Sequence, residues 1–475
     1  MKKLFAVLAA ATMLLSGCAS NQAEAPAGPA WDEEVDVLIV GAGGSGMTAA
    51  IEAKTAGAEK VLVIEKQEAL NGVTYLCEGI LSGYETKLAK KYDVHYTAED
   101  CYNQMMNSAL YAIDPDLTWI TAEQCGPLID WLADEVGVPF KDEVDQQPFY
   151  GPNRLLHYVE GGGAGYREPF TNKLNELGVE LRFNNKAVKL VGNDAHDEVI
   201  GAEVETPEGT KTIKADSVVL CTGGYANSTE MIQRMNPRNR CLKANHEGGA
   251  TGDAMIMASE FGALLHNQDE AKYGLSDMNG SSYTFRGTIQ IGQDGKRFRD
   301  EKGHPNASRI GLHAAMNRSE VDYIWAFGDA NHIASSEYNQ KAVEKNKSVV
   351  SADTIEELAV KMEIDPATLQ ATVDAWNESC DLGFDKEHGR YVAMDKIETA
   401  PYYALKLSPL VGMSYGGVVR NEKGEVIKVN GNTIPGLYVA GEAAEGANAN
   451  GWTCSHALTW GRIAGKNAAA YAMSK

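Results

Sequence analysis

The sequence predicts an α/β fold built around a Rossmann-like domain, and three stretches of the chain support this prediction. In the first, "EEVDVLIVGAGGSGMTAAIEAKTAGAEKVLVIEK", an apolar strand at Val35 to Val40 leads through a glycine loop into a helix and then into a second strand. The other two, "SVVLCTGGYANS" and "IPGLYVAGEAAEG", each read as an apolar strand that ends in a glycine turn. We therefore expect one sheet to which the chain returns twice.

The first stretch has the order of parts that a dinucleotide site needs. The loop supplies Gly41, Gly43 and Gly46, and the second strand ends in Glu65, about 20 residues beyond the loop. Glycines let the backbone approach a pyrophosphate, the helix N-terminus stabilises its negative charge, and the acid can accept hydrogen bonds from a ribose. NAD and FAD both fit this unit. The two later returns to the sheet are typical of FAD domains of the glutathione-reductase type, and they favour FAD.

The N-terminus "MKKLFAVLAAATMLLSGC" predicts an export signal over residues 1–17. Its apolar run from Leu4 to Leu15 is shorter than the ~20 residues that a membrane-spanning helix requires. "LSGC" resembles the lipobox of bacterial lipoproteins, which implies lipidation of Cys18; the alternative is an ordinary cleaved signal with a chance cysteine. Residues 18–30 read as a flexible tether. We expect a protein anchored by lipid at the extracytoplasmic face of the cell membrane.

Composition excludes some functions. The chain has 475 residues, 44% of them hydrophobic, which suits two to three domains with large cores. A formal charge of −22 disfavours nucleic acid as a partner, because phosphate binding needs a concentrated basic surface. The eight cysteines include no CxxC or CxxCH motif, so neither a metal site nor a built-in haem is expected. Electrons must then come from a separate donor protein or a membrane electron carrier.

Further motifs carry a resemblance to a known family. "NHEGGATGDAMIMASEFGALL", "DGKRFRDE", "APYYALKLSP" and "ALTWGRIAG" resemble segments of the flavoproteins that include soluble fumarate reductases, flavocytochrome c, urocanate reductase and 3-ketosteroid dehydrogenases. The resemblance covers roughly residues 36–470. It implies an FAD-binding domain of residues 31–235 and 346–475, with an inserted α+β capping domain of residues 236–345 that binds the substrate.

The resemblance also implies how the cofactor is held. "NGVTYLCEGIL" lacks the histidine by which some members attach flavin, so noncovalent FAD is expected. A helix beginning near His456 would direct its N-terminus at the flavin, where its dipole favours the anionic reduced form. The residues that would contact FAD are Gly41, Gly43, Ser45, Gly46, Glu65, Thr74, Gly79, Ile80, Val188, Asp253, Glu442, Ala457 and Leu458.

The expected substrate differs from fumarate. Family members move a hydride between flavin and one carbon of a polarised C–C bond, while a side chain handles a proton at the neighbouring carbon. Fumarate reductases hold two carboxylates with histidines and arginines. Aligned on the family motifs, Tyr273 and Met413 stand at the histidine positions and Trp452 at a clamping arginine. With Tyr415 nearby, such a pocket suits a flat, neutral enone, lactone or aromatic compound.

The proton donor is the least determined part of the site. "GKRFRDEKGHPNASR", residues 295–309, has the charge density of a solvated loop, although its "GKRF" and Glu301 match the family. In the fumarate reductases of the family, an arginine acts as the proton donor. His304 stands beside the position of that arginine and can supply a proton near neutral pH. Its rivals are Tyr283, Tyr415 and Arg309, the last also a candidate substrate-binding residue. Arg286 resembles a family arginine on the proton path.

The leading hypothesis is an exported, lipid-anchored FAD reductase of C=C bonds. One alternative is a ketone or steroid dehydrogenase that runs in the oxidative direction. Another is a monocarboxylate reductase, in which Arg299 or Arg309 replaces the missing clamp. A ligand-binding lipoprotein without turnover is disfavoured by the intact glycine loop, Glu65 and Glu442.

Overall fold

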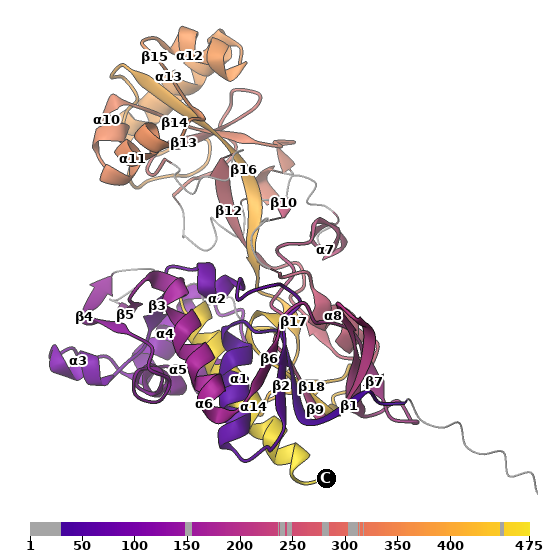
Figure 1. Cartoon of the computed structure of the whole chain (residues 1–475). Helices are drawn as coiled ribbons and strands as arrows, with labels where there is room; N and C mark the ends of the chain where they lie inside the picture. Colours follow the sequence, from indigo (N-terminus) through magenta and orange to yellow (C-terminus); the bar gives the residue numbers. More distant parts are fainter. Residues whose placement is uncertain are drawn as a thin grey trace, which may run out of the picture. The chain divides into compact units, whose positions relative to one another are not determined.

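The structure is a computed structural model that describes residues 30–147, 154–235, 237, 243–244, 249–277, 285–302, 312, 314–316, 318–446 and 451–475 (Figure 1). The predicted signal peptide, the tether and Cys18 lie outside the described residues. Within the described part, none of the helices is both long enough and apolar enough to cross a membrane.

An eight-stranded sheet forms the base of the fold. Its main path runs in the order β18-β19-β9-β1-β2-β6, and β7 and β8 extend it from β9. The pairs β1/β2, β1/β9, β9/β19 and β2/β6 are parallel. The predicted α/β class and the two returns to one sheet are therefore confirmed. The strands are β1 (Glu33–Val40), β2 (Val61–Ile64), β6 (Glu180–Arg182), β7 (Lys186–Gly192), β8 (Val199–Thr206), β9 (Gly209–Leu220), β18 (Glu425–Ile427) and β19 (Thr433–Val439).

Two helices pack closely against each other beside this sheet. They are α1 (Gly44–Thr55) and α14 (Thr453–Ala472), which lie side by side in Figure 1. Glycine allows the close approach, since a Cβ built on Gly461 would lie 2.2 Å from the Ser45 carbonyl oxygen. A Cβ on Gly465 would lie 2.1 Å from the Ala49 carbonyl oxygen. Small residues thus bring the start of α14 next to the glycine loop that opens α1.

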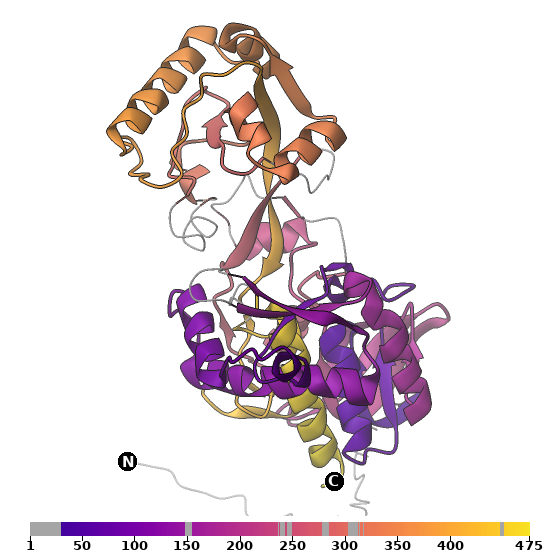
Figure 2. The same ribbon diagram turned by 90° about the vertical axis from the view of Figure 1, so that its left-hand side faces the viewer.

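A six-stranded sheet carries the second core of the fold. It has the order β10-β16-β14-β13, with β12 and β15 also paired to β16. The long strand β16 runs from this sheet into the lower part of the fold (Figure 2), and the Ser414 N–H at its end donates to Glu442 at 2.8 Å. The strands are β10 (Lys243–Ala244), β12 (Ala271–Asp277), β13 (Ile289–Gly292), β14 (Ile324–Asp329), β15 (Val349–Ala352) and β16 (Tyr402–Ser414), and the helices around them are α10 (Ala330–Ala334), α11 (Glu337–Lys345), α12 (Ile355–Met362) and α13 (Pro366–Leu382).

The six-stranded sheet takes strands from both sides of the predicted domain boundary at residue 345. The boundary itself stays a prediction. The remaining elements lie around the two sheets and connect them. They are α2 (Val73–Leu76), β3 (Ile80–Ser82), α3 (Lys87–Lys91), α4 (Ala98–Ser108), α5 (Pro115–Trp131), η1 (Leu132–Val136), β4 (Phe140–Gln147), β5 (Arg154–Val159), η2 (Gly162–Tyr166), α6 (Arg167–Leu177), α7 (Thr229–Met235), α8 (Asp253–Ser259), β11 (Leu265–His266), β17 (Gly417–Val418) and η3 (Gly441–Ala443).

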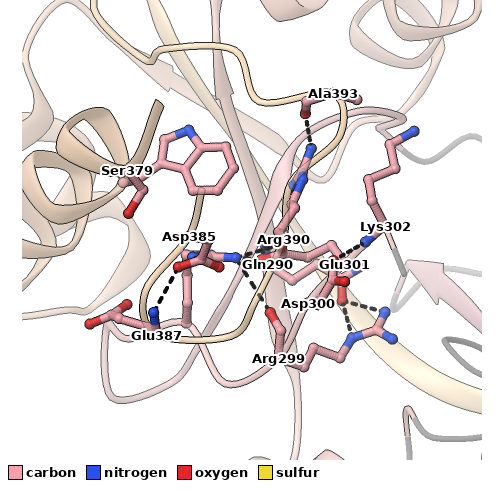
Figure 3. Close-up of polar contacts among 12 residues, drawn as sticks. Gln290, Arg299, Asp300, Glu301, Lys302, Ser379, Asp385, Glu387, Arg390 and Ala393 are labelled. Atoms are coloured by element: carbon pink, nitrogen blue, oxygen red, sulfur yellow. Dashed lines mark hydrogen bonds and ion pairs between the residues drawn. The ribbon is translucent and has the colours of Figure 1, made fainter. Parts of the chain in front are cut away.

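Part of the charged stretch after β13 is buried, although its Lys296 and Lys302 are exposed. Arg297 and Glu301 form an ion pair at 2.8 Å with side chains only 1% and 3% exposed. Arg390 and Asp385, which follow α13, complete the cluster through contacts of 3.1 Å to Glu301 and 2.9 Å to Arg297 (Figure 3). This part of the run is therefore not simply a solvated loop, because Arg297 and Glu301 are neutralised inside the fold.

Candidate functional site

The glycine loop has the geometry of a phosphate-binding turn. Gly41 has φ +104°, and a Cβ there would meet the Cys221 carbonyl oxygen at 2.4 Å. A Cβ on Gly46 would lie 1.8 Å from the Gly41 carbonyl oxygen. Gly43, in contrast, has no heavy atom within 4 Å of the position of a built Cβ. Two glycines close the turn, and the third leaves bare backbone facing open space.

Glu65 holds the loop from the end of β2. One of its carboxylate oxygens accepts the Ala42 N–H at 2.9 Å, and the other accepts the Gln67 N–H at 2.9 Å. Beside it, Lys66 forms an ion pair with Asp253 at 2.7 Å. Glu65, the acid predicted from spacing, therefore stands at the glycine loop. Lys66, the next residue, links the end of β2 to the start of α8.

These elements surround a cleft with an empty volume of about 1050 Å³. Glu442 lines it and accepts the Ser414 N–H at 2.8 Å, and a Cβ on Gly224 would clash with Ser414 Oγ at 1.7 Å. The predicted cofactor residues in its wall are Gly41, Gly43, Ser45, Glu65, Thr74, Asp253, Glu442 and Ala457. Gly46, Gly79, Ile80, Val188 and Leu458 stand next to or behind this wall in the chain and do not line the cleft.

The N-terminal turn of α14 faces the cleft. The helix begins at Thr453, three residues before the predicted start near His456. Thr453, Cys454 and Ala457 line the cleft, whereas Leu458 packs behind the loop, where its carbonyl accepts the Thr48 hydroxyl at 3.1 Å. The unpaired N–H groups and positive dipole end of the helix therefore lie where negative charge would be stabilised.

The cleft fits a flavin dinucleotide. Bare backbone at Gly43 leaves room for a pyrophosphate, and the Glu65 carboxylate stands where a ribose hydroxyl can donate to it. The model of a protein family described as FAD binding domain matches residues 36–457. The chain belongs to this family. FAD is accordingly its cofactor, as the two returns to the sheet predict.

Several relatives of this flavoprotein are named as reductases of unsaturated compounds. A probable fumarate reductase of Shewanella frigidimarina is 30% identical over 94% of this chain and 77% of its own. The vinyl phenol reductase of Lactiplantibacillus plantarum is 26% identical over 92% of this chain and 97% of its own. The solved open conformation of a flavocytochrome c3 fumarate reductase superposes with a TM-score of 0.80 and 29% identity, covering 93% of this chain and 79% of that one. The protein is an FAD-dependent oxidoreductase that acts on C=C bonds.

The predicted substrate residues fall in different places of the flavoprotein. Met413, at the end of β16, is buried and lines the FAD cleft. The backbone of Tyr273 pairs with Val411, two residues before Met413, while the Tyr273 side chain lies outside the described residues. Tyr415 is also buried, and its N–H donates to the Glu270 carbonyl at 2.9 Å. The end of β16 therefore brings the Tyr273 backbone, Met413 and Tyr415 together along one edge.

Trp452 lines a second, smaller cleft with an empty volume of about 380 Å³. Arg420 lies in the same wall and donates to the Glu445 carbonyl at 2.7 Å, and its guanidinium stacks 4.0 Å from the Trp460 ring centre. His456 completes this wall, and its burial together with the charge of Arg420 lowers its pKa well below the usual value. Trp452 is thus apart from the cleft that Met413 lines.

Of the four predicted proton donors, Tyr415 is the one that the structure describes. His304, Tyr283 and Arg309 lie outside the described residues. Arg286 is exposed, its guanidinium stacks 3.8 Å from the centre of the Tyr338 ring, and it lines neither of the two clefts. Arg299, the alternative clamp, is directed at Gln290, which accepts from it at 2.8 and 3.0 Å.

Several residues of the cleft wall were missed by sequence reasoning. Lys66 and Gln67 directly follow the predicted acid, and their position beside Glu65 was a usable signal. Cys77 and Cys454 line the cleft from α2 and α14, and no local spacing connects them. Asn185 precedes the strand β7 and Lys186 is its first residue, and the register of this strand shifts at Val188.

Proposed function

We propose that this flavoprotein is an exported, lipid-anchored reductase whose substrate is a neutral enone, lactone or aromatic alkene rather than fumarate. The observation that carries the proposal is the wall of the FAD cleft. Met413 occupies it where the family's histidine is expected, and no arginine is among the described residues that line it. Two lysines lie in the same wall: the charge of Lys66 is already paired with Asp253, and Lys186 is exposed at the start of β7. A thioether favours contact with an apolar, polarisable molecule over a carboxylate.

In the proposed reaction, bound FAD supplies the hydride-transfer chemistry. The chain's own task is to keep water out, to position the alkene and to provide a proton. Buried Met413 and Tyr415 supply the apolar surface near the end of β16. His304 is the proposed proton donor, with Tyr283 and Tyr415 as alternatives and Arg286 on the proton path.

A substrate screen tests the proposal directly. We expect holoprotein reduced under anaerobic conditions to be reoxidised by an unsaturated ketone, an unsaturated lactone or a vinyl phenol at least about 100-fold faster than by fumarate, because no arginine among the described cleft residues can clamp its two carboxylates. The measurement is the return of oxidised flavin absorbance, with formation of one saturated product per flavin. Free reduced flavin mixed with the same compounds is the control.

Other outcomes of the screen would replace the proposal. Fumarate as the fastest oxidant would contradict it, and acrylate as the fastest would favour the monocarboxylate alternative with Arg309. Faster dye-coupled oxidation of the saturated ketone than reduction of the enone would favour a dehydrogenase. Tight binding of a neutral compound without any flavin reoxidation would favour the ligand-binding lipoprotein.

The proposed lipid anchor rests on the sequence "LSGC" and has a separate test. We expect the full-length protein to sediment with membranes and to be released only by detergent, because an acyl chain partitions into the bilayer. Cys18→Ser removes the thiol that would be lipidated, so the variant is expected in the soluble extracytoplasmic fraction. Equal membrane association of wild type and Cys18→Ser would show that another feature holds the protein there.

A further inference from the structure

The structure pairs four of its cysteines in two different environments. Cys101 of α4 and Cys125 of α5 have sulfur atoms 3.8 Å apart, and both side chains are completely buried. Cys77 and Cys454 also have interacting thiols, but both are partly exposed and line the FAD cleft. The first pair belongs to a core cluster with Met105. The second pair faces the space that FAD occupies.

Cys77 has the surroundings of a reactive thiol. It directly follows α2, and its sulfur accepts the Gly79 N–H at 3.3 Å. A hydrogen bond from the Cys454 thiol, assisted by that backbone N–H, lowers the pKa of Cys77 to about 7 against the effect of burial. The Cys77 thiol also donates to the Thr74 carbonyl oxygen at 3.1 Å, and loss of this proton gives the thiolate, which is the form that attacks a disulfide.

Cys454 has the opposite character. It lies in the first turn of α14, beside the completely buried Tyr166 ring. Its interaction with Cys77, together with burial, raises the pKa of Cys454 well above the usual value. Cys77 is thus the thiol that ionises more easily, and the neighbouring Cys454 is the thiol that stays protonated. This division between an attacking and a resolving cysteine is what thiol–disulfide exchange requires.

We propose that Cys77 and Cys454 form a dithiol–disulfide couple in the wall of the FAD cleft, which small disulfides oxidise and which then retains the cofactor. The Cys77 thiolate attacks one sulfur of the small disulfide, forms a mixed disulfide and releases one thiolate. The Cys454 thiol loses its proton and attacks the Cys77 sulfur, which releases the second thiolate. Two protein thiols are thereby oxidised to one disulfide, and one small disulfide is reduced to two thiols.

The new bond would link two sides of the cofactor cleft. Cys77 follows α2, whose Thr74 hydroxyl accepts the Gly44 N–H of the glycine loop at 3.1 Å. Cys454 belongs to α14, which packs along α1. A covalent link between α2 and α14 restricts the separation of these elements that FAD release requires. Oxidation is therefore expected to slow release by about tenfold.

Mass spectrometry of the holoprotein treated with oxidised glutathione tests the chemistry. Wild type should lose the mass of two hydrogen atoms, and peptide mapping should join Cys77 to Cys454. Cys454→Ser should instead retain one glutathione on Cys77, and Cys77→Ser should show neither change. Cys125→Ser is the matched control, because it removes the buried pair and should still lose two hydrogen atoms.

The second measurement is the rate at which FAD fluorescence appears after dilution of the holoprotein. Oxidised wild type and Cys125→Ser should release FAD about tenfold more slowly than their dithiothreitol-reduced forms, and Cys454→Ser should show no such difference. The proposal is overturned if wild type stays reduced, if Cys77→Ser still loses two hydrogen atoms, if Cys454→Ser forms no adduct, or if oxidation leaves the release rate unchanged.

Discussion

Replacing Glu301 by glutamine should lower the free energy of unfolding by about 3–5 kcal/mol, the range for breaking a buried ion pair from one side. Glu301 accepts from Arg297 at 2.9 and 2.8 Å and from Arg390 at 3.1 Å, and its side chain is 3% exposed. Both guanidiniums also stack on the Trp376 ring, with 4.6 and 4.8 Å between guanidinium carbon and ring centre. The amide would leave these two buried charges with Asp385 as the one anion of the four-residue cluster (Figure 3).

Urea unfolding at neutral pH measures this change. The matched control is Glu337→Gln, which removes an exposed ion pair of 2.7 Å with Lys341 and should unfold at the same urea concentration as wild type. Equal midpoints for Glu301→Gln and wild type would mean that the cluster contributes little to stability.

The loss of stability in Glu301→Gln should also depend on pH. Burial opposes ionisation of Glu301, but its hydrogen bonds to Arg297 and the charge of Arg390 hold the pKa of this carboxyl below its usual value. A lowered pKa in the folded state stabilises the fold above the unfolded pKa of glutamate, about 4.3, and this contribution is lost as the pH falls through the folded value. The stability difference between wild type and Glu301→Gln should therefore be constant near neutrality and shrink in acid.

Local patterns explain why the nucleotide loop was predictable. Gly41, Gly46 and Glu65 stand in one short stretch, and the strand, turn and helix between them determine their relative positions. The buried ion cluster has no such pattern, because Asp385 and Arg390 follow α13, far along the chain from Arg297. A dense run of charges ordinarily lies on the surface. Arg297 and Glu301 can be buried here because Asp385 and Arg390 pair with them.

The substrate pocket was predictable in part for the same reason. Met413 was placed by family alignment, and it does line the FAD cleft. Trp452 was aligned across a stretch shorter than the family's, and it lines a separate cleft beside Arg420. The cysteine pair of the FAD cleft was not predicted, since a search for CxxC spacing cannot find Cys77 and Cys454, which are far apart in the chain and meet in the wall of the cleft.

Gly43→Ala should weaken FAD binding by about 10–100-fold without unfolding the protein, the cost of placing an extra methyl in a packed contact. The residue has φ −68°, which alanine adopts, and its built Cβ meets no protein atom within 4 Å. The space it would fill is the cleft itself, where backbone must approach the pyrophosphate. Gly46→Ala is different, because its Cβ would lie 1.8 Å from the Gly41 carbonyl oxygen and must distort the loop.

The two variants separate cofactor contact from loop integrity. FAD affinity by fluorescence and thermal unfolding of the FAD-free protein should show loss of affinity alone for Gly43→Ala, and loss of both affinity and stability for Gly46→Ala. Gly274→Ala is the control, since its Cβ would make an ordinary contact of 3.6 Å with Leu410 in β16. If Gly43→Ala binds FAD as tightly as wild type, the pyrophosphate does not approach this backbone, and the orientation of the dinucleotide in the cleft must be different. A lower unfolding temperature of FAD-free Gly43→Ala would instead show that the open space beside the loop is needed by the fold itself.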